Sequence, residues 1–171
     1  LALRNRRRID ALEQYTDTRI YGVSWDKSES SALTRTNAAT GMVANAGVDG
    51  QPVQNDFDSA SIWGGMRDVL DERGNVFVRI PKLYIRKTDT ENSKTWQVSR
   101  YPHKGFYLPW CFWDFERGVE LPYIDIGKYN ASLSGDNKLE SKPDTYPPIS
   151  KTSVNFRDYA RANNAGGSRG C

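Results

Sequence analysis

The sequence predicts a β-rich α+β fold with long loops and a short helix at the N-terminus. Apolar residues recur at every second position at Val76, Val78 and Ile80, which is the period of a half-buried strand. Near the N-terminus they recur instead at spacings of three and four, as in a helix. Fourteen glycines and eight prolines among 171 residues indicate frequent turns. A chain of this length can form one domain that buries about 70% of its unfolded surface.

The N-terminal spacing has the form of a coiled-coil seam. Its positions are Ala2, Asn5, Ile9, Leu12 and Thr16. A polar Asn at such a position weakens packing but can fix the register and the number of chains. We expect residues 1–18 to end a longer helical stalk that joins subunits through Asn5, Ile9 and Leu12, with residues 19–171 as the attached domain. The alternative is one amphipathic helix docked on its own domain, because two heptads are marginal alone.

Positive charge is concentrated in the same segment. Four arginines carry more positive charge than the net charge of +3 of the whole chain, so the remaining residues have a net charge of −1. These four arginines are Arg4, Arg6, Arg7 and Arg8. An arginine cluster can contact nucleic acid, but the nearly neutral remainder favours a solvated helix face instead. The sequence has neither an apolar run of 18 residues nor a signal-peptide pattern, so we expect no membrane association.

A β-hairpin is predicted after the first strand. The apolar set resumes beyond Pro81 at Leu83 and Ile85, on the opposite parity. Because proline cannot donate to a ladder, a bulge or an edge position at Pro81 would explain this change. Residues 83–86 and 96–98 then flank a polar run, which predicts two strands joined by a long exposed loop. Further extended segments are expected near residues 105–109 and 123–129.

The stretch between residues 26 and 61 is polar and rich in small side chains, which predicts long loops with one ordered piece at 32–36. Four of its residues carry the oxygen ligands that calcium prefers: Asp49, Asn55, Asp56 and Asp58. Their spacing does not match an EF-hand loop. We therefore favour solvated turn carboxylates and expect no metal and no cofactor.

Helical spacing returns in two segments. A helix is predicted over residues 59–70, capped by Asp58 or Ser59, and because Gly64-Gly65 weakens it, the alternative is a turn with one helical face. A second helix is predicted over residues 153–163, with Ser153 as its N-cap and Gly166-Gly167 as its stop. Its apolar face would carry Phe156, Tyr159, Ala160 and Asn163.

Residues 96–129 hold ten of the 20 aromatic side chains. In a strand, Trp110 and Phe112 would share one face, and Trp113 and Phe115 the other, so at least one pair is expected in the core or in a subunit interface. The alternative is a platform that stacks on the apolar faces of sugar rings. Its candidate ligand-binding residues are Trp110, Trp113, Asp114, Glu116 and Arg117.

Candidate catalytic residues are few. His103 is the only histidine, and no carboxylate beside it in the sequence would orient it for a Ser–His or Cys–His arrangement. Cys111 lies in the aromatic run, which indicates a buried, small apolar side chain. A disulfide between Cys111 and Cys171 stays open. We therefore expect that the protein is not an enzyme.

Seven motifs, taken in order, resemble a family of bacteriophage tail-fibre and related virion proteins. They are YGVSWD (21–26), ALTRT (32–36), IPK-x-Y (80–84), W-x-V-S (96–99), GF-x-x-P (105–109), Y-I-x-I-GKYN-x-S (123–132) and FR-x-YA (156–160). The resemblance implies a C-type-lectin-like domain, related to formylglycine-generating enzymes. The copper-binding cysteine pair of those enzymes has no match in this chain, so their activity is not implied.

The same resemblance makes the ends of the chain informative. In the family, a helix like the one predicted over 153–163 precedes a further Trp/Tyr-rich half, which carries variable ligand-facing positions. We therefore expect either a fragment of a longer protein, as Leu1 in place of Met also indicates, or a fold that closes differently.

The expected function is that of a phage structural protein, made in the host cytoplasm and placed on the exterior of the virion. It would be a fibre or receptor-binding component that attaches to the host, with other virion proteins as partners. The resemblance implies a homotrimer, in which weak contacts with a host glycan gain avidity. One alternative is a head fibre, decoration or baseplate adaptor protein with a purely structural role. The other is a degenerate formylglycine-generating enzyme.

Overall fold

The computed structural model describes residues 18–29, 33–47, 50 and 52–164. Several predictions lie outside these residues: the stalk seam at Asn5, Ile9 and Leu12, the arginine cluster, Asp49, the Gly166-Gly167 stop and Cys171. They stay predictions.

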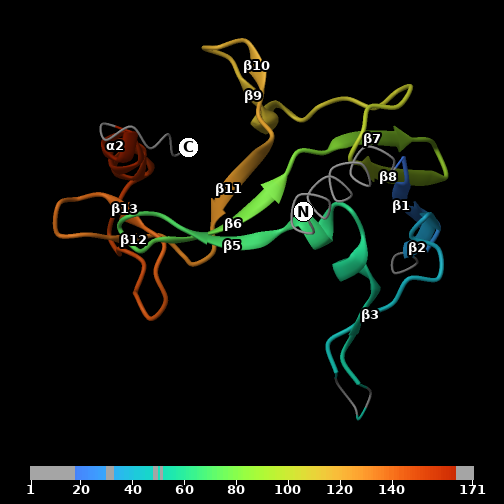
Figure 1. Cartoon of the computed structure of the whole chain (residues 1–171), viewed down its shortest axis with the longest axis horizontal. Helices are drawn as coiled ribbons and strands as arrows, with labels where there is room; N and C mark the ends of the chain where they lie inside the picture. Colours follow the sequence, from blue (N-terminus) through green and yellow to red (C-terminus); the bar gives the residue numbers. More distant parts are fainter. Residues whose placement is uncertain (1–17, 30–32, 48–49, 51, 165–171) are drawn as a thin grey trace, which may run out of the picture. The chain divides into compact units, whose positions relative to one another are not determined.

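The described part of the chain is β-rich and contains one α-helix, near its C-terminal end, which confirms the predicted β-rich α+β class (Figure 1). The strands form several small sheets. The elements are β1 (Ile20–Asp26), β2 (Leu33–Asn37), β3 (Ala44–Asn45), β4 (Gln54–Asn55), η1 (Asp56–Ser59), η2 (Trp63–Gly65), β5 (Arg67–Leu70), β6 (Val76–Pro81), β7 (Tyr84–Asp89), β8 (Ser93–Ser99), η3 (Trp110–Phe112), β9 (Trp113–Asp114), β10 (Val119–Glu120), β11 (Tyr123–Gly127), β12 (Ser132–Leu133), β13 (Leu139–Glu140) and α2 (Ser153–Asn164).

The chain divides into two compact units. The first contains Leu1–Met66 and Ile80–Ile124, and the second contains Arg67–Arg79 and Asp125–Cys171. Each unit is thus built from two separate stretches of the chain. In the described residues, no helix has the length and apolar character needed to cross a membrane.

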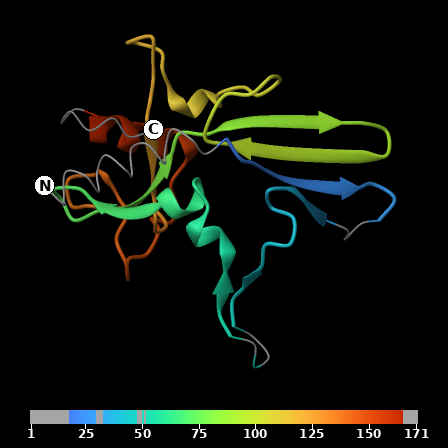
Figure 2. The ribbon, with the colours of Figure 1, turned by 45° about the vertical axis from the view of Figure 1, so that its right-hand side comes forward.

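A four-stranded antiparallel sheet, in the order β2-β1-β8-β7, belongs to the first unit (Figure 2). Its β7–β8 pair is the hairpin that the sequence predicts, and pairing extends to Asp89 and Lys94. Only residues 90–92 connect the two strands, so the loop is shorter than predicted.

A row of four register partners crosses this sheet, one on each strand: Arg86, Gln97, Gly22 and Thr36. Arg86 Nε donates to Gln97 Oε1 at 2.7 Å, and Gln97 Nε2 donates to Asn37 Oδ1 at 2.8 Å. A Cβ atom on Gly22 would lie 2.4 Å from Thr36 Oγ1, so this position has no room for a side chain.

The first unit has an apolar core. Its buried centre consists of Tyr21, Ala39, Ala60 and Ile62, surrounded by the half-buried Ala38, Met42, Phe57, Trp63, Met66, Leu83 and Val98. The Trp63 ring makes edge-to-face contacts with Tyr21 and Phe57, at centroid distances of 5.1 and 4.8 Å. The core therefore fixes the orientation of the Phe57 and Trp63 rings, which are both half-buried.

The predicted helix over residues 59–70 is wrong. Two 3-10 turns, η1 and η2, occupy this stretch, and strand β5 follows them. The cap of η1 is Asn55, whose side chain accepts from Phe57 N, and not Asp58 or Ser59. A Cβ atom on Gly64 would lie 2.3 Å from the carbonyl oxygen of Asp58, so the two turns can pack closely only because of this glycine.

The parity change near Pro81 coincides with the end of a strand. Pro81 is the last residue of β6, the middle strand of a three-stranded sheet in the order β11-β6-β5. The apolar set that resumes at Leu83 and Ile85 leads into β7, which belongs to the four-stranded sheet. The parity changes because one strand ends and another begins.

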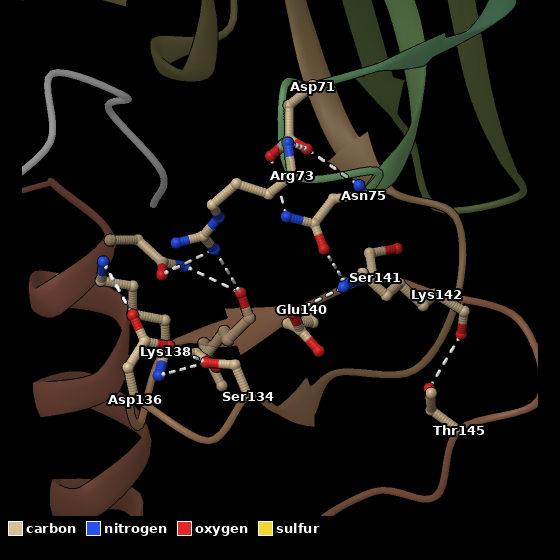
Figure 3. Close-up of polar contacts among 12 residues, drawn as sticks. Asp71, Arg73, Asn75, Ser134, Asp136, Lys138, Glu140, Ser141, Lys142 and Thr145 are labelled. Carbon is tan, nitrogen blue, oxygen red and sulfur yellow. Dashed lines mark hydrogen bonds and ion pairs between the residues drawn. The ribbon is translucent and has the colours of Figure 1, made fainter.

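The second unit has a polar interior. Its buried residues in the described part are Asn75, Ser132 and Ser141. Asn75 Nδ2 donates to Asp71 Oδ2 at 2.8 Å, and Asn75 Oδ1 accepts from Ser141 N at 3.0 Å (Figure 3). Ser141 Oγ donates in turn to the carbonyl oxygen of Val76 at 2.8 Å. These bonds tie the turn before β6 to the end of β13.

Helix α2 confirms the predicted helix but begins with a different cap. Asn155 N donates to Thr152 Oγ1 at 3.2 Å, while Thr152 N donates to Asn155 Oδ1 at 3.0 Å. Thr152, and not Ser153, is thus the capping residue. The predicted face is confirmed, since its members are half-buried: Phe156, Tyr159, Ala160 and Asn163. Asn163 Nδ2 donates to the carbonyl oxygen of Leu139 on β13 at 3.2 Å.

Candidate recognition surface

The five candidate ligand-binding residues all lie on or beside a small hairpin of the first unit, formed by β9 and β10 (Figure 1). Asp114 organises its loop: the carboxylate accepts from the backbone N–H groups of Glu116 and Arg117, both at 3.1 Å. Its carbonyl oxygen accepts from Gly118 N at 2.8 Å, and Gly118 has a φ of 65°. We call residues 110–120 the aromatic hairpin.

Two aromatic rings of the aromatic hairpin are strongly exposed. Trp110 is 83% exposed and Phe115 is 70% exposed, and their rings meet edge to face at a centroid distance of 6.3 Å. Phe112, only 2% exposed, is the buried anchor between them in sequence. Exposed aromatic rings of this size typify interaction surfaces more than packing surfaces.

The predicted sharing of faces in this run is wrong. Trp110 and Phe112 belong to the 3-10 turn η3, so they do not alternate as strand residues would. Trp110 points outward and Phe112 inward, although they were expected to share one face. The strand is limited to Trp113 and Asp114, and Trp113 is 36% exposed.

The polar candidates have unequal access to solvent. The Asp114 side chain is 10% exposed and holds the loop together, so its role is structural. Arg117 is 69% exposed and lies 3.7 Å from the Asp114 carboxylate. Glu116 is exposed on the loop. A hairpin that carries both an outward cationic side chain and exposed rings is typical of protein interfaces.

The contacts that anchor the aromatic hairpin were not predicted from the sequence. Lys82 Nζ lies 2.7 Å from Glu120 Oε2, and the Tyr84 hydroxyl donates to the same oxygen at 3.1 Å. The hydrogen bond to Glu120 raises the pKa of Lys82, and the bond from Lys82 lowers the pKa of Glu120. Burial, followed by the bond to Glu120, raises the pKa of Tyr84. Lys82 and Tyr84 both belong to the IPK-x-Y motif, so this motif is the sequence feature that could have indicated the anchor.

His103 contacts a buried serine, and Cys111 differs from its predicted burial. His103 Nε2 lies 3.0 Å from Ser99 Oγ, and Ser99 is 0% exposed, so this Ser–His contact is closed to a substrate. Tyr101 N also donates to Ser99 Oγ, as in an ordinary turn. Cys111 is exposed with a free thiol, so the prediction that it is buried is wrong.

The carboxylates considered for calcium build turns. Asp56 Oδ2 accepts from Val43 N at 2.7 Å, and this bond lowers the pKa of Asp56. Asp58 Oδ1 accepts from Asn55 Nδ2 at 2.7 Å. In the described ranges, no three His, Cys, Asp or Glu side chains gather closely enough to share a metal ion.

Comparison of the chain with known protein families, with curated proteins and with solved structures finds no match. The order of the sequence motifs therefore stays the basis of the expected phage relationship.

Proposed function

We propose that this protein is a virion structural protein of a tailed bacteriophage, a fibre or receptor-binding component that contacts the host surface. The phage assignment rests on the order of the seven sequence motifs. The observation that carries the recognition role is the exposed pair Trp110 and Phe115 on an anchored hairpin. We further propose a C-type-lectin-like domain and a trimeric stalk over residues 1–18.

The aromatic hairpin suits surface recognition because it combines apolar area with a fixed loop. Trp and Arg are enriched among residues that dominate binding energies. The Asp114 turn and the Lys82–Glu120 ion pair hold this loop before any partner arrives. A preformed loop loses little conformational entropy on binding, which favours affinity.

Attachment of the assembled protein to host cells tests the proposal. The variants Trp110→Ala and Phe115→Ala, alone and combined, should weaken binding at least about tenfold, as expected for truncated interface anchors. Tyr146→Ala, which removes a ring that is 91% exposed in the second unit, is the matched control. An assembled trimer that binds no host surface would contradict the receptor-binding role.

A purely structural role is the second candidate. The observation in its favour is the apolar surface of the second unit, where Tyr146 is 91% exposed and Ile149 is 84% exposed. Neighbouring virion proteins could bury such side chains. The variant Ile149→Asp would then reduce incorporation into particles, while Trp110→Ala would not. Normal incorporation of both variants, with host attachment weakened in Trp110→Ala, supports the receptor-binding role.

A further inference from the structure

A concave site lies beside the apolar core of the first unit. Asn55, Phe57, Asp58, Trp63 and Met66 line a cavity of about 620 Å³ that opens to solvent. We call it the Trp63 pocket. Pockets that bind small ligands measure roughly 300–1,000 Å³. The Trp63 pocket is therefore large enough for a single six-membered ring with its substituents.

The apolar wall of the Trp63 pocket is held rigidly. Phe57, Trp63 and Met66 all pack against the buried centre of the core. Trp63 is fixed between Tyr21 and Phe57 by two edge-to-face contacts. The close packing of η1 and η2 that Gly64 permits sets the distance between the two halves of the wall. Rigid aromatic walls of this kind are preorganised for a ligand.

The polar rim of the pocket offers a donor and an acceptor side by side. Asn55 Nδ2 donates to Asp58 Oδ1 at 2.7 Å, and Asn55 Oδ1 accepts from Phe57 N at 3.3 Å. An amide nitrogen has two N–H groups, and a carboxylate can accept several hydrogen bonds. Two neighbouring hydroxyl groups of a ligand match this pair, because a hydroxyl both donates and accepts.

A nearby positive charge indicates which ligands suit the pocket. The Arg35 guanidinium lies 5.2 Å from the centre of the Phe57 ring. This positive charge beside the Phe57 ring disfavours a cationic ligand, which would otherwise suit aromatic rings beside a carboxylate. A neutral ligand with one apolar face and several hydroxyl groups fits best.

We propose that the Trp63 pocket binds the pyranose ring of a neutral sugar. The apolar face of the ring lies on the Trp63 and Phe57 wall, and two adjacent hydroxyl groups bond to Asn55 and Asp58. This inference rests on the proposed function, for which it names a ligand class and a site separate from the aromatic hairpin.

Saturation-transfer NMR on the full chain tests the proposal, with glucose, galactose, mannose and N-acetylglucosamine as probes. At least one sugar should receive saturation on its ring protons. Asp58→Asn keeps the volume but removes the charge, and it should weaken binding at least about tenfold, the loss expected for a hydrogen bond to a charged group. Asp144→Asn alters an exposed carboxylate of the second unit and should change nothing.

Several outcomes overturn the inference. One is the absence of binding by all four sugars, and another is unchanged affinity in Asp58→Asn. Loss of sugar binding in Trp110→Ala, with Asp58→Asn unaffected, would place the sugar on the aromatic hairpin. Binding of choline in preference to every sugar would also contradict the proposal. Sugar binding that survives while host attachment is absent would overturn only the proposed function.

Discussion

The two units of this chain hold themselves together by different chemistry. In the described residues, every buried apolar side chain lies in the first unit: Tyr21, Ala39, Ala60, Ile62, Tyr84 and Phe112. In the described residues of the second unit, the buried side chains are all polar: Asn75, Ser132 and Ser141. Apolar burial is non-directional and scales with area, whereas a buried polar group needs a partner in one geometry. The first unit also buries the polar Gln97 and Ser99, so the contrast between the units is the apolar core that the first unit has in addition.

Both units expose large apolar side chains. In the second unit these include Leu70, Ile126, Tyr146 and Ile149, and in the first unit they include Leu33, Val53, Trp110 and Phe115. In the first unit, half-buried aromatic side chains pack on the core and line the Trp63 pocket. A site that needs a fixed aromatic wall is therefore expected in the first unit.

Removing apolar volume from the first core should have the largest effect. Ile62 is 1% exposed, and Ile62→Ala should lower the free energy of unfolding by about 2–5 kcal/mol, because it removes buried methyl groups and leaves a cavity. Urea denaturation measures the loss. Ile149→Ala, the same change at a position 84% exposed, should stay within about 0.5 kcal/mol. Equal losses would contradict the contrast between the units.

Removing one polar group from the second interior should have the next largest effect. Asn75→Ala leaves Asp71 Oδ2 and the Ser141 N–H without this partner, so unfolding should become easier by about 1–3 kcal/mol. Asn130→Ala, at an exposed position of the same unit, is the control. If Asn75→Ala matches this control, the interior is not held by these bonds.

The sequence predicted local structure well where periodicity decides it. The β7–β8 hairpin and α2 were predicted because alternation and helical spacing are properties of a short stretch. The helix predicted over 59–70 failed because the conformation there depends on the contact of Gly64 with Asp58, which spacing does not reveal. The polar interior around Asn75 was also missed, since nothing in a sequence marks a buried asparagine.

In the candidate sites, too, contacts between residues distant in the sequence were not predicted. Trp110, Trp113 and Arg117 lie on or beside one hairpin, since they are neighbours in the sequence. Glu120 was missed as an anchor because its partners, Lys82 and Tyr84, are 38 and 36 residues away. The prediction that Trp110 and Phe112 share a strand face was wrong because Pro109 leads into a 3-10 turn.

Substitutions at the cap of α2 should have a smaller effect, and they test whether Thr152 or Ser153 is the capping residue. Thr152→Ala removes the hydroxyl that accepts from Asn155 N and should cost about 1 kcal/mol of stability. Ser153→Ala, at the residue predicted from sequence as the cap, should cost less than about 0.5 kcal/mol. Thermal unfolding of the two variants decides between them. The opposite order of losses would make Ser153 the cap.

Acid should weaken the polar interior gradually. Burial tends to raise the pKa of Asp71, but hydrogen bonds from the side chain and backbone of Asn75, and from the backbone of Arg73, outweigh it and hold the pKa below its ordinary value of 3.8. A lowered pKa stabilises the folded state above that ordinary value, and this contribution is lost as pH falls through the folded pKa. The stability difference between the natural chain and Asp71→Asn should therefore shrink below pH 3.8 in urea titrations. A difference that stays constant from neutral pH into this range would mean that the Asp71 charge does not support the second unit.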